Sequence, residues 1–259
     1  MALIQVNFIS QALRRTVPIQ VILPVDCHPL SKIAPQEKPF KTLYLLHGIF
    51  GNHTDWVTNT RIQKWAEAKN LAVVMPAGDN AFYLDYPETG NLYGEFIGRE
   101  LVEITRRMFP LSCKREDTFI GGLSMGGYGA LRNGLKYHET FSHIAVLSGA
   151  LHMLENTDIR PVSKEYSCFG DLKEAIKSDK NPRVLLQTLR QKIQDDPTVS
   201  FPKIYQTCGT EDFLFDVNCV YRDLLQSYGI DLTWEALPGH HDWDFWDMTI
   251  CRVLDWLPL

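Results

Sequence analysis

The 259-residue sequence predicts an α/β protein in which helices cover both faces of a mostly parallel sheet. Two observations lead to this class. Apolar runs of five or six residues recur along the chain, and segments with helical periodicity separate them. The composition is globular, with 45% hydrophobic and 22% charged residues. The net charge of −5 and the absence of a basic stripe argue against nucleic acid as a partner.

Each element follows from local pattern and from the residues that interrupt it. Two strand-like stretches between Val6 and Leu23 should pair antiparallel around a turn at 14–16, and four prolines predict a loop over 24–40. Further strands are expected at 42–46, 71–75, 117–122, 141–147, 203–208 and 232–237. Helices are expected at 61–69, 95–109, 126–137, 215–228 and 243–256.

Residues 151–200 break the alternation of strands and helices. This stretch is polar and rich in Lys and Asp, and it predicts short helical pieces without a buried strand. The sequence shows no linker and no internal repeat. We therefore expect one domain spanning 1–259, with a small cap inserted at about 151–200.

The cysteines and the N-terminus bear on the compartment. The first residues lack the basic and apolar regions of a secretory signal, and no apolar run approaches the ~20 residues that cross a bilayer. The six cysteines are scattered, with no CxxC pair, so reduced thiols are expected. The sequence predicts a cytoplasmic protein without a membrane partner.

The most informative segment is the pattern G-x-S-x-G formed by Gly122, Ser124 and Gly126. It follows an expected strand and precedes an expected helix, which is the context of a nucleophile elbow. Glycines suit such a turn because neighbouring backbones come too close for side chains. Ser124 is therefore the candidate nucleophile. A glycine-rich turn that only packs a helix against a strand is the alternative.

A serine hydroxyl needs a base, and the base needs a carboxylate to orient it. In this architecture the acid and then the histidine follow the serine along the chain. His240 and His241 follow the last expected strand, and Glu211, Asp212 and Asp216 follow the strand before it. Spacing alone leaves both choices open, with some preference for His241 and Asp212.

An oxyanion that forms during ester attack needs preorganised donors. The backbone N–H of Met125, directly after the nucleophile, is one candidate. Ile49, in the His47-Gly48-Ile49 turn after the strand at 42–46, is the candidate for the second amide. We expect His47 to anchor this turn by hydrogen bonds and not to act as a base.

Together these segments resemble the esterase D-like branch of the α/β-hydrolases, in particular tributyrin and acetyl esterases and the related feruloyl esterases. Two short patterns of that family, G-x-x-D-x-L and G-x-H-x-W, match Gly209 with Asp212 and Gly239 with His241, which implies that these two residues are the acid and the base. The other matching stretches are Leu45-Leu46-His47-Gly48 with Gly51, Asn52 and Trp56, and Gly122 to Gly129.

The resemblance implies an α/β-hydrolase fold and a serine esterase that hydrolyses short-chain acyl esters through an acyl-enzyme intermediate. It implies a small-molecule ester as the substrate, no cofactor, and homo-oligomers, which relatives often form. S-formylglutathione hydrolase, feruloyl or acetyl-xylan esterase, acyltransferase, and a non-catalytic interaction protein with the hydrolase fold remain alternatives.

Two further hypotheses concern the surroundings of the site. Trp56 and Tyr83 stand in loops where aromatic rings could border the substrate pocket. His and Asp residues between His240 and Asp247 are good metal ligands, but they lack H-E-x-x-H or the usual Cys/His spacing, so no metal is expected.

Overall fold

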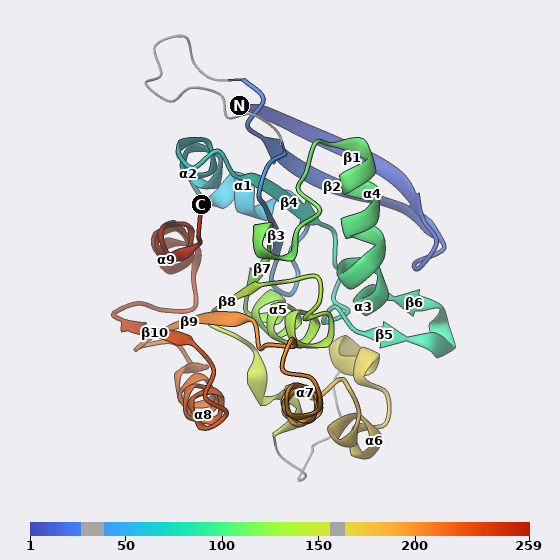
Figure 1. Cartoon of the computed structure of the whole chain (residues 1–259), viewed down its shortest axis with the longest axis vertical. Helices are drawn as coiled ribbons and strands as arrows, with labels where there is room; N and C mark the ends of the chain where they lie inside the picture. Colours follow the sequence, from blue (N-terminus) through green and yellow to red (C-terminus); the bar gives the residue numbers. More distant parts are fainter. Residues whose placement is uncertain (27–38, 156–163) are drawn as a thin grey trace.

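An eight-stranded sheet runs through the protein, as the computed structural model shows (Figure 1). The structure describes residues 1–26, 39–155 and 164–259. The sheet contains β1 (Ala2–Ser10), β2 (Arg15–Leu23), β3 (Thr42–Leu46), β4 (Ala72–Pro76), β7 (Thr118–Leu123), β8 (His143–Leu147), β9 (Lys203–Gly209) and β10 (Leu232–Leu237). Their order across the sheet is β1–β2–β4–β3–β7–β8–β9–β10. A separate two-stranded sheet pairs β5 (Asp85–Tyr86) with β6 (Asn91–Leu92).

The large sheet is mostly parallel, as predicted. Only the first two pairings, β1 with β2 and β2 with β4, are antiparallel. From β4 to β10 every pairing is parallel. The predicted antiparallel opening pair is confirmed, but its turn lies at 11–14, because Ser10 already pairs with Arg15. Arg14 closes this turn with a φ of 50°, without a glycine that would have marked the position.

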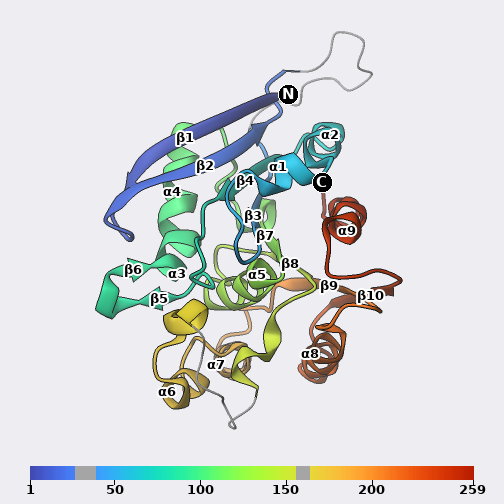
Figure 2. The same ribbon diagram turned by 180° about the vertical axis from the view of Figure 1, so that it is seen from behind.

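Helices lie on both sides of the large sheet (Figures 1 and 2). The α-helices are α1 (Asp55–Asn59), α2 (Ile62–Ala68), α3 (Tyr93–Glu95), α4 (Leu101–Met108), α5 (Met125–Lys136), α6 (Leu172–Lys177), α7 (Pro182–Asp195), α8 (Phe215–Ser227) and α9 (Trp243–Trp256). Short 3₁₀ segments are η1 (Pro87–Thr89), η3 (Arg115–Asp117), η4 (Leu151–Leu154) and η5 (Lys164–Phe169), and η2 (Phe96–Glu100) is a π-helical turn.

Alternate residues of β3 enter two separate apolar cores, one on each face of the sheet. Tyr44 and Leu46 belong to the core that α4, α5, α7 and α8 share. Leu43 and Leu45 belong to the core of α1, α2 and α9. Because side chains of a strand point alternately to opposite faces, a strand covered on both sides must be apolar throughout. All five residues of β3 are buried, which explains the continuous apolar run.

The predicted elements differ from the structure mainly at their ends. Strands 42–46 and 232–237 and helix 243–256 have the predicted bounds. The other strands and helices agree to within two residues, except for the first strand, which begins at Ala2 and not at Val6, and the helix expected at 95–109. There the structure has α3, the π-helical turn η2 and then α4. α1 and the β5–β6 hairpin were not predicted from the sequence. Most of the predicted loop at 24–40 lies outside the described residues.

The insertion between β8 and β9 contains η4, η5, α6 and α7. Residues 156–163 of the predicted cap lie outside the described residues. The sequence predicted only short helical pieces here, but α7 has 14 residues, with the Asn181 side chain accepting from the Arg183 N–H at its start. Leu186 and Leu189 of α7 are buried in the core that also contains α5. The polar composition therefore conceals one amphipathic helix.

A buried arginine ties the insertion to α5. Arg132 of α5 has no exposed surface, and its Nη2 lies 3.0 Å from Asp179 Oδ2 and 3.7 Å from Asp85 Oδ2. Lys136, one turn further along α5, lies 2.7 Å from the same Asp179 oxygen. A buried charge needs such partners because its desolvation is expensive. The cluster fixes the insertion and the β5–β6 hairpin to the helix that follows Ser124.

Two further observations bear on the compartment and the membrane. Cys113, Cys168, Cys208, Cys219 and Cys251 carry free thiols, and Cys27 lies outside the described residues. Within the described ranges, no helix combines the length and the apolar character needed to span a bilayer.

The free energy of unfolding should decrease at acid pH because of His143. His143 begins β8 between the rings of Phe119 and Trp256, with centroids 5.3 and 5.1 Å away, and burial lowers its pKa from 6.5 to about 4. Between pH 6.5 and about 4 the imidazole binds a proton in the unfolded chain but not in the folded chain. The stability of the fold therefore decreases as the pH drops through this range. The full difference would correspond to about 3 kcal/mol, and screening by water at this partly exposed ring reduces it to about 1–2 kcal/mol.

Urea unfolding from about pH 7 to pH 4 tests this expectation. The variant His143→Asn keeps a polar atom near Ser142 Oγ, which lies 2.8 Å from His143 Nδ1, and cannot titrate there. Its stability should fall by about 1–2 kcal/mol less than that of the wild type, since other groups titrate equally in both. Equal losses in the two proteins would contradict the assignment.

Candidate active site

Ser124 lies on the sharp turn between β7 and α5. Its φ of 53° and ψ of −116° place a non-glycine residue in a strained backbone conformation. The turn is held by the Ser124 N–H, which donates to the Leu147 carbonyl at 2.9 Å, and by the Ala150 N–H, which donates to the Ser124 carbonyl at 2.9 Å. These bonds from the end of β8 keep the hydroxyl at the carboxyl edge of the sheet, where parallel α/β folds assemble their sites.

The two glycines of G-x-S-x-G are required by close backbone contacts. A Cβ at Gly126 would lie 2.5 Å from the Leu46 carbonyl oxygen, and a Cβ at Gly122 would lie 2.5 Å from the Gly126 oxygen. Both obstacles are backbone atoms, which cannot rotate away. The turn therefore accepts only glycine at these positions without displacing α5 from β3.

Ser124, His241 and Asp212 form a continuous hydrogen-bonded relay. His241 Nε2 lies 3.0 Å from Ser124 Oγ, and His241 Nδ1 lies 2.8 Å from Asp212 Oδ2. Because a carboxylate only accepts, Nδ1 must carry the imidazole proton, which leaves Nε2 free to accept from the serine hydroxyl. The three residues come from loops after β7, β10 and β9. This arrangement can activate a serine hydroxyl for attack on a carbonyl carbon.

The Asp212 carboxylate is buried but stays charged. Burial alone would raise its pKa, but hydrogen bonds from His241, the Leu214 N–H at 2.8 Å and the Ser148 hydroxyl together lower the pKa below its ordinary value. An ionised carboxylate can stabilise the imidazolium that forms when His241 takes a proton. Ser148, directly after β8, is a member of the site that the sequence analysis missed.

The other candidates for acid and base lie outside this relay. His240 is exposed and lines a different cavity, together with Asp242 and Asp244. Glu211 is exposed, and its Oε2 accepts from the Gly239 N–H at 2.5 Å. Asp216 is exposed in the first turn of α8. In the part of the chain that the structure describes, no group of three or more His, Cys, Asp or Glu residues could hold a metal ion.

His47 fixes the turn that faces Ser124. Its Nε2 accepts from the Gly78 N–H at 2.8 Å, so Nδ1 carries the proton and donates to the Gly48 carbonyl at 2.7 Å. Burial lowers the pKa of His47, which favours this neutral form. The geometry agrees with an anchoring role for His47.

The hypothesis that Trp56 and Tyr83 border the pocket is wrong. Their side chains are 1% and 0% exposed, which leaves no surface for a substrate. Trp56 Nε1 donates to the Leu46 carbonyl at 3.0 Å, and Tyr83 Oη donates to the His47 carbonyl at 2.9 Å. Both aromatic residues support the backbone of the His47 turn from behind, because a buried indole N–H or phenol O–H needs a partner.

Two backbone amides remain available to an oxyanion. Met125 is the first residue of α5, where an N–H has no partner within its own helix. Ile49 lines both cavities that contain Ser124. Among residues 1–26, 39–155 and 164–259, neither amide donates to another protein atom. The position of these groups is compatible with the predicted oxyanion hole, whose role stays a prediction.

Two cavities meet at Ser124. The larger, about 260 Å³, is lined by Gly48, Ile49, Phe50, Gly51, Asp55, Leu123, Ser124, His241, Trp243 and Trp246. The smaller, about 160 Å³, is lined by Ile49, Phe82, Ser124, Met125, Ala150, His152, Phe213, Leu214 and His241. Phe50 and Phe213 are 74% and 77% exposed at these cavities. Their positions next to Ile49 and Asp212 in the sequence are a signal that could have identified them.

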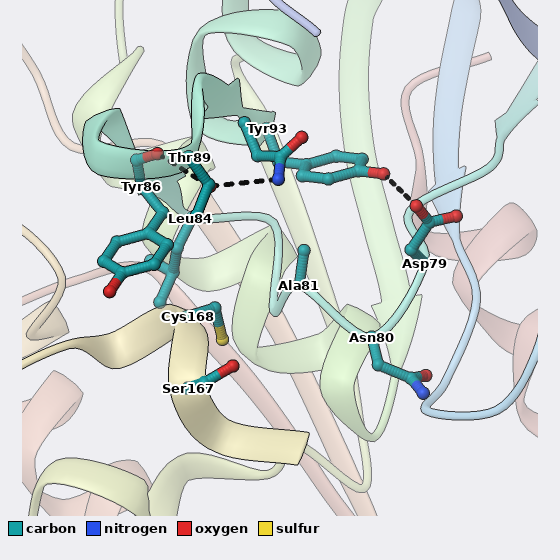
Figure 3. Close-up of a pocket in the computed structure, with 10 residues that line it drawn as sticks. Asp79, Asn80, Ala81, Leu84, Tyr86, Thr89, Tyr93, Ser167 and Cys168 are labelled. Atoms are coloured by element: carbon teal, nitrogen blue, oxygen red, sulfur yellow. Dashed lines mark hydrogen bonds between the residues drawn. The ribbon is translucent and has the colours of Figure 1, made fainter. Parts of the chain in front are cut away.

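A third cavity, about 440 Å³, lies apart from Ser124 near the β5–β6 hairpin (Figure 3). Asp79 and Asn80 lie on one side, and Tyr86, Ser167 and Cys168 lie on the other. Asp79 accepts a hydrogen bond from the Tyr93 hydroxyl at 2.6 Å. This cavity shares no lining residue with the two at Ser124 and contains no member of the relay.

The sheet order, the nucleophile turn and the relay together define an esterase of the α/β-hydrolase class. Residues 10–257 match the family described as putative esterase, and the chain belongs to this family.

Individual esterases and hydrolases are similar to this chain over almost its full length. An acetyl esterase from Caldicellulosiruptor saccharolyticus is 45% identical over 99% of this chain and 98% of its own. Two solved structures from Staphylococcus aureus, an S-formylglutathione hydrolase and the fluorophosphonate-binding serine hydrolase F, are each 31% identical. They superpose with TM-scores of 0.83 and 0.84, over 99% of this chain and 98% of theirs.

Proposed function

We propose that this protein is a serine carboxylesterase that removes short acyl groups, acetyl foremost, from small-molecule esters. The relay from Ser124 through His241 to Asp212 carries the proposal, because it ends at a hydroxyl that opens into two cavities. The acetyl esterase that is 45% identical to this chain supports the choice of acyl group.

The reaction follows from the direction of each hydrogen bond. His241 Nε2 takes the proton of Ser124 while Oγ attacks the ester carbonyl carbon, and the Met125 and Ile49 amides hold the resulting oxyanion. The imidazolium, stabilised by Asp212, gives its proton to the departing alcohol, and an acyl-enzyme remains. His241 then takes a proton from water, which attacks the acyl-enzyme. Collapse of the second intermediate releases the acid and restores Ser124.

The two cavities differ in a way that suits the two halves of an ester. The smaller one is lined mainly by apolar groups, including Phe82, Ala150 and Leu214, so it suits a short acyl chain. The larger one contains the Asp55 carboxylate and the backbone of the Gly48 turn, so it suits the alcohol. We assign the acyl and alcohol groups accordingly.

This assignment predicts a preference for short chains. Across p-nitrophenyl acetate, butyrate, hexanoate and octanoate, kcat/KM should reach its maximum at acetate or butyrate and should not rise further with chain length. Methylenes that find no room in a cavity of about 160 Å³ stay in water and forgo the stabilisation of burial. That stabilisation is about 0.8 kcal/mol, or roughly a factor of four, for each buried methylene. A kcat/KM that rises steadily to octanoate would contradict the assignment.

S-formylglutathione hydrolysis is a second candidate function. It is supported by the Staphylococcus aureus hydrolase of that name, which is 31% identical over nearly the whole chain. The same relay serves thioesters, since a thiol leaves at least as readily as an alcohol. Comparing kcat/KM for S-formylglutathione with that for p-nitrophenyl acetate and an acetylated sugar separates the two candidates. A preference for the thioester of a hundredfold or more would favour the second.

The compartment is part of the proposal. We propose that the enzyme works in the cytoplasm, and the free thiols of Cys113, Cys168, Cys208, Cys219 and Cys251 support this placement. Reducing compartments keep such thiols unpaired, whereas in the oxidising environment of secreted proteins cysteines tend to form disulfides.

A further inference from the structure

Asp55 places a carboxylate in the larger cavity at Ser124. It is the first residue of α1 and is partly buried. An ideal Cβ at Gly51 would lie 2.2 Å from Asp55 Oδ2 and 3.1 Å from His47 Nδ1. The carboxylate therefore lies directly against the turn that presents the Ile49 amide, in space that the missing side chain of Gly51 leaves open.

No cation of the described chain neutralises this carboxylate. The nearest lysine or arginine along the sequence, Arg61, is engaged by Asp247, with Nη2 and Oδ2 2.6 Å apart. Within the described ranges, Asp55 takes part in no ion pair and its side chain accepts no hydrogen bond from the protein. None of the other residues that line the cavity is a lysine, an arginine, an aspartate or a glutamate. A lone negative charge thus faces the space assigned to the alcohol.

We propose that Asp55 selects esters by the charge of the alcohol group, favouring cationic or hydroxylated alcohols and disfavouring anionic ones. The inference rests on the proposed function and on the placement of the alcohol in the larger cavity. A carboxylate attracts a cation, and it accepts hydrogen bonds from hydroxyl groups that an apolar wall would leave unpaired. It repels the carboxylates of an anionic alcohol or thiol.

The expected effect is moderate because the cavity is open to water. Two unit charges about 8 Å apart in an effective dielectric of about 40 change a rate about fivefold. The effect should have opposite signs for cations and anions. This reversal distinguishes an electrostatic role from a structural one, which would change all substrates alike.

Three phenyl acetates that differ mainly in the charge of the para substituent provide the test. They are 4-acetoxybenzoate, its methyl ester, and 4-acetoxy-N,N,N-trimethylanilinium, which are anionic, neutral and cationic. The wild type, Asp55→Asn and the control Asp244→Asn are compared by kcat/KM. Asp244 is exposed and lines a different cavity with His240, so Asp244→Asn makes the same change of net charge outside the site.

For Asp55→Asn, the anionic-to-neutral ratio of kcat/KM should rise about fivefold and the cationic-to-neutral ratio should fall by a similar factor. In Asp244→Asn both ratios should stay within about a factor of 1.5 of the wild type, since screening by water weakens distant charges. Ratios in Asp55→Asn that stay within this margin, or that both move in one direction, would overturn the proposal.

Two measurements guard against ambiguous results. If Asp55→Asn fails to fold, Asp55→Ser and the ionic-strength dependence of the wild type replace it, because added salt should speed the anionic ester and slow the cationic one relative to the neutral ester. If added salt leaves the anionic-to-neutral and cationic-to-neutral ratios of kcat/KM unchanged, the proposed role of Asp55 is also overturned. If the wild type hydrolyses none of the three acetates, the proposed function itself fails, which is a different result.

Discussion

Replacing Ser124 by alanine is expected to lower kcat for p-nitrophenyl acetate by about 10⁵–10⁶-fold. The variant removes the oxygen that lies 3.0 Å from His241 Nε2, so no acyl-enzyme can form. The oxyanion donors and the cavities remain, so residual hydrolysis should still exceed the reaction in water. Steady-state kinetics over a range of substrate concentrations measure the loss, with the background reaction subtracted.

The Ser124→Ala variant should remain folded, because its change removes a single hydroxyl and leaves no larger space behind. Circular dichroism and thermal unfolding check this. A fluorophosphonate probe should label the wild type at Ser124 and leave the variant unlabelled. Hydrolysis at the wild-type rate in a folded variant would show that another group is the nucleophile.

Replacing Asp212 by asparagine is expected to lower kcat by about 10⁴-fold. An asparagine amide can turn its N–H toward His241 Nδ1, which stabilises the tautomer that has its proton on Nε2. That tautomer cannot accept the proton of Ser124. The carboxylate is also lost as the partner of the imidazolium, although the carbonyl of asparagine can still accept from the Leu214 N–H.

Asp216→Asn is the matched control for this variant. Asp216 is exposed in the first turn of α8, only four residues after Asp212, and the same change there should leave kcat within about twofold. Steady-state kinetics of both variants at one pH separate the relay from a general effect of charge. A loss below about tenfold in Asp212→Asn would show that the carboxylate does not orient the base.

The nucleophile turn could be predicted because its requirements are local. Gly122 and Gly126 meet backbone atoms of their own turn and of β3, so the sequence carries the constraint in five adjacent positions. The strand at 42–46 could be predicted as well, because a strand buried on both faces has an uninterrupted apolar run.

The surroundings of the site could not be predicted, since burial depends on distant segments. Trp56 and Tyr83 are aromatic residues of the kind that often line pockets, but here they are buried and hydrogen-bonded to the backbone of the His47 turn. Asp55 faces the cavity because Gly51 leaves space beside it, and no pattern in the sequence reveals that contact. Spacing alone also could not separate His241 from His240, because adjacent residues of an irregular loop point in directions that only the folded backbone determines.

The positive φ of Ser124 has an evolutionary consequence. A glycine at this position would relax the backbone, so the residue that gives the protein its chemistry is one that selection for thermal robustness alone would discard. Lineages of this fold that lose their hydrolytic role are therefore free to drift toward glycine at the elbow.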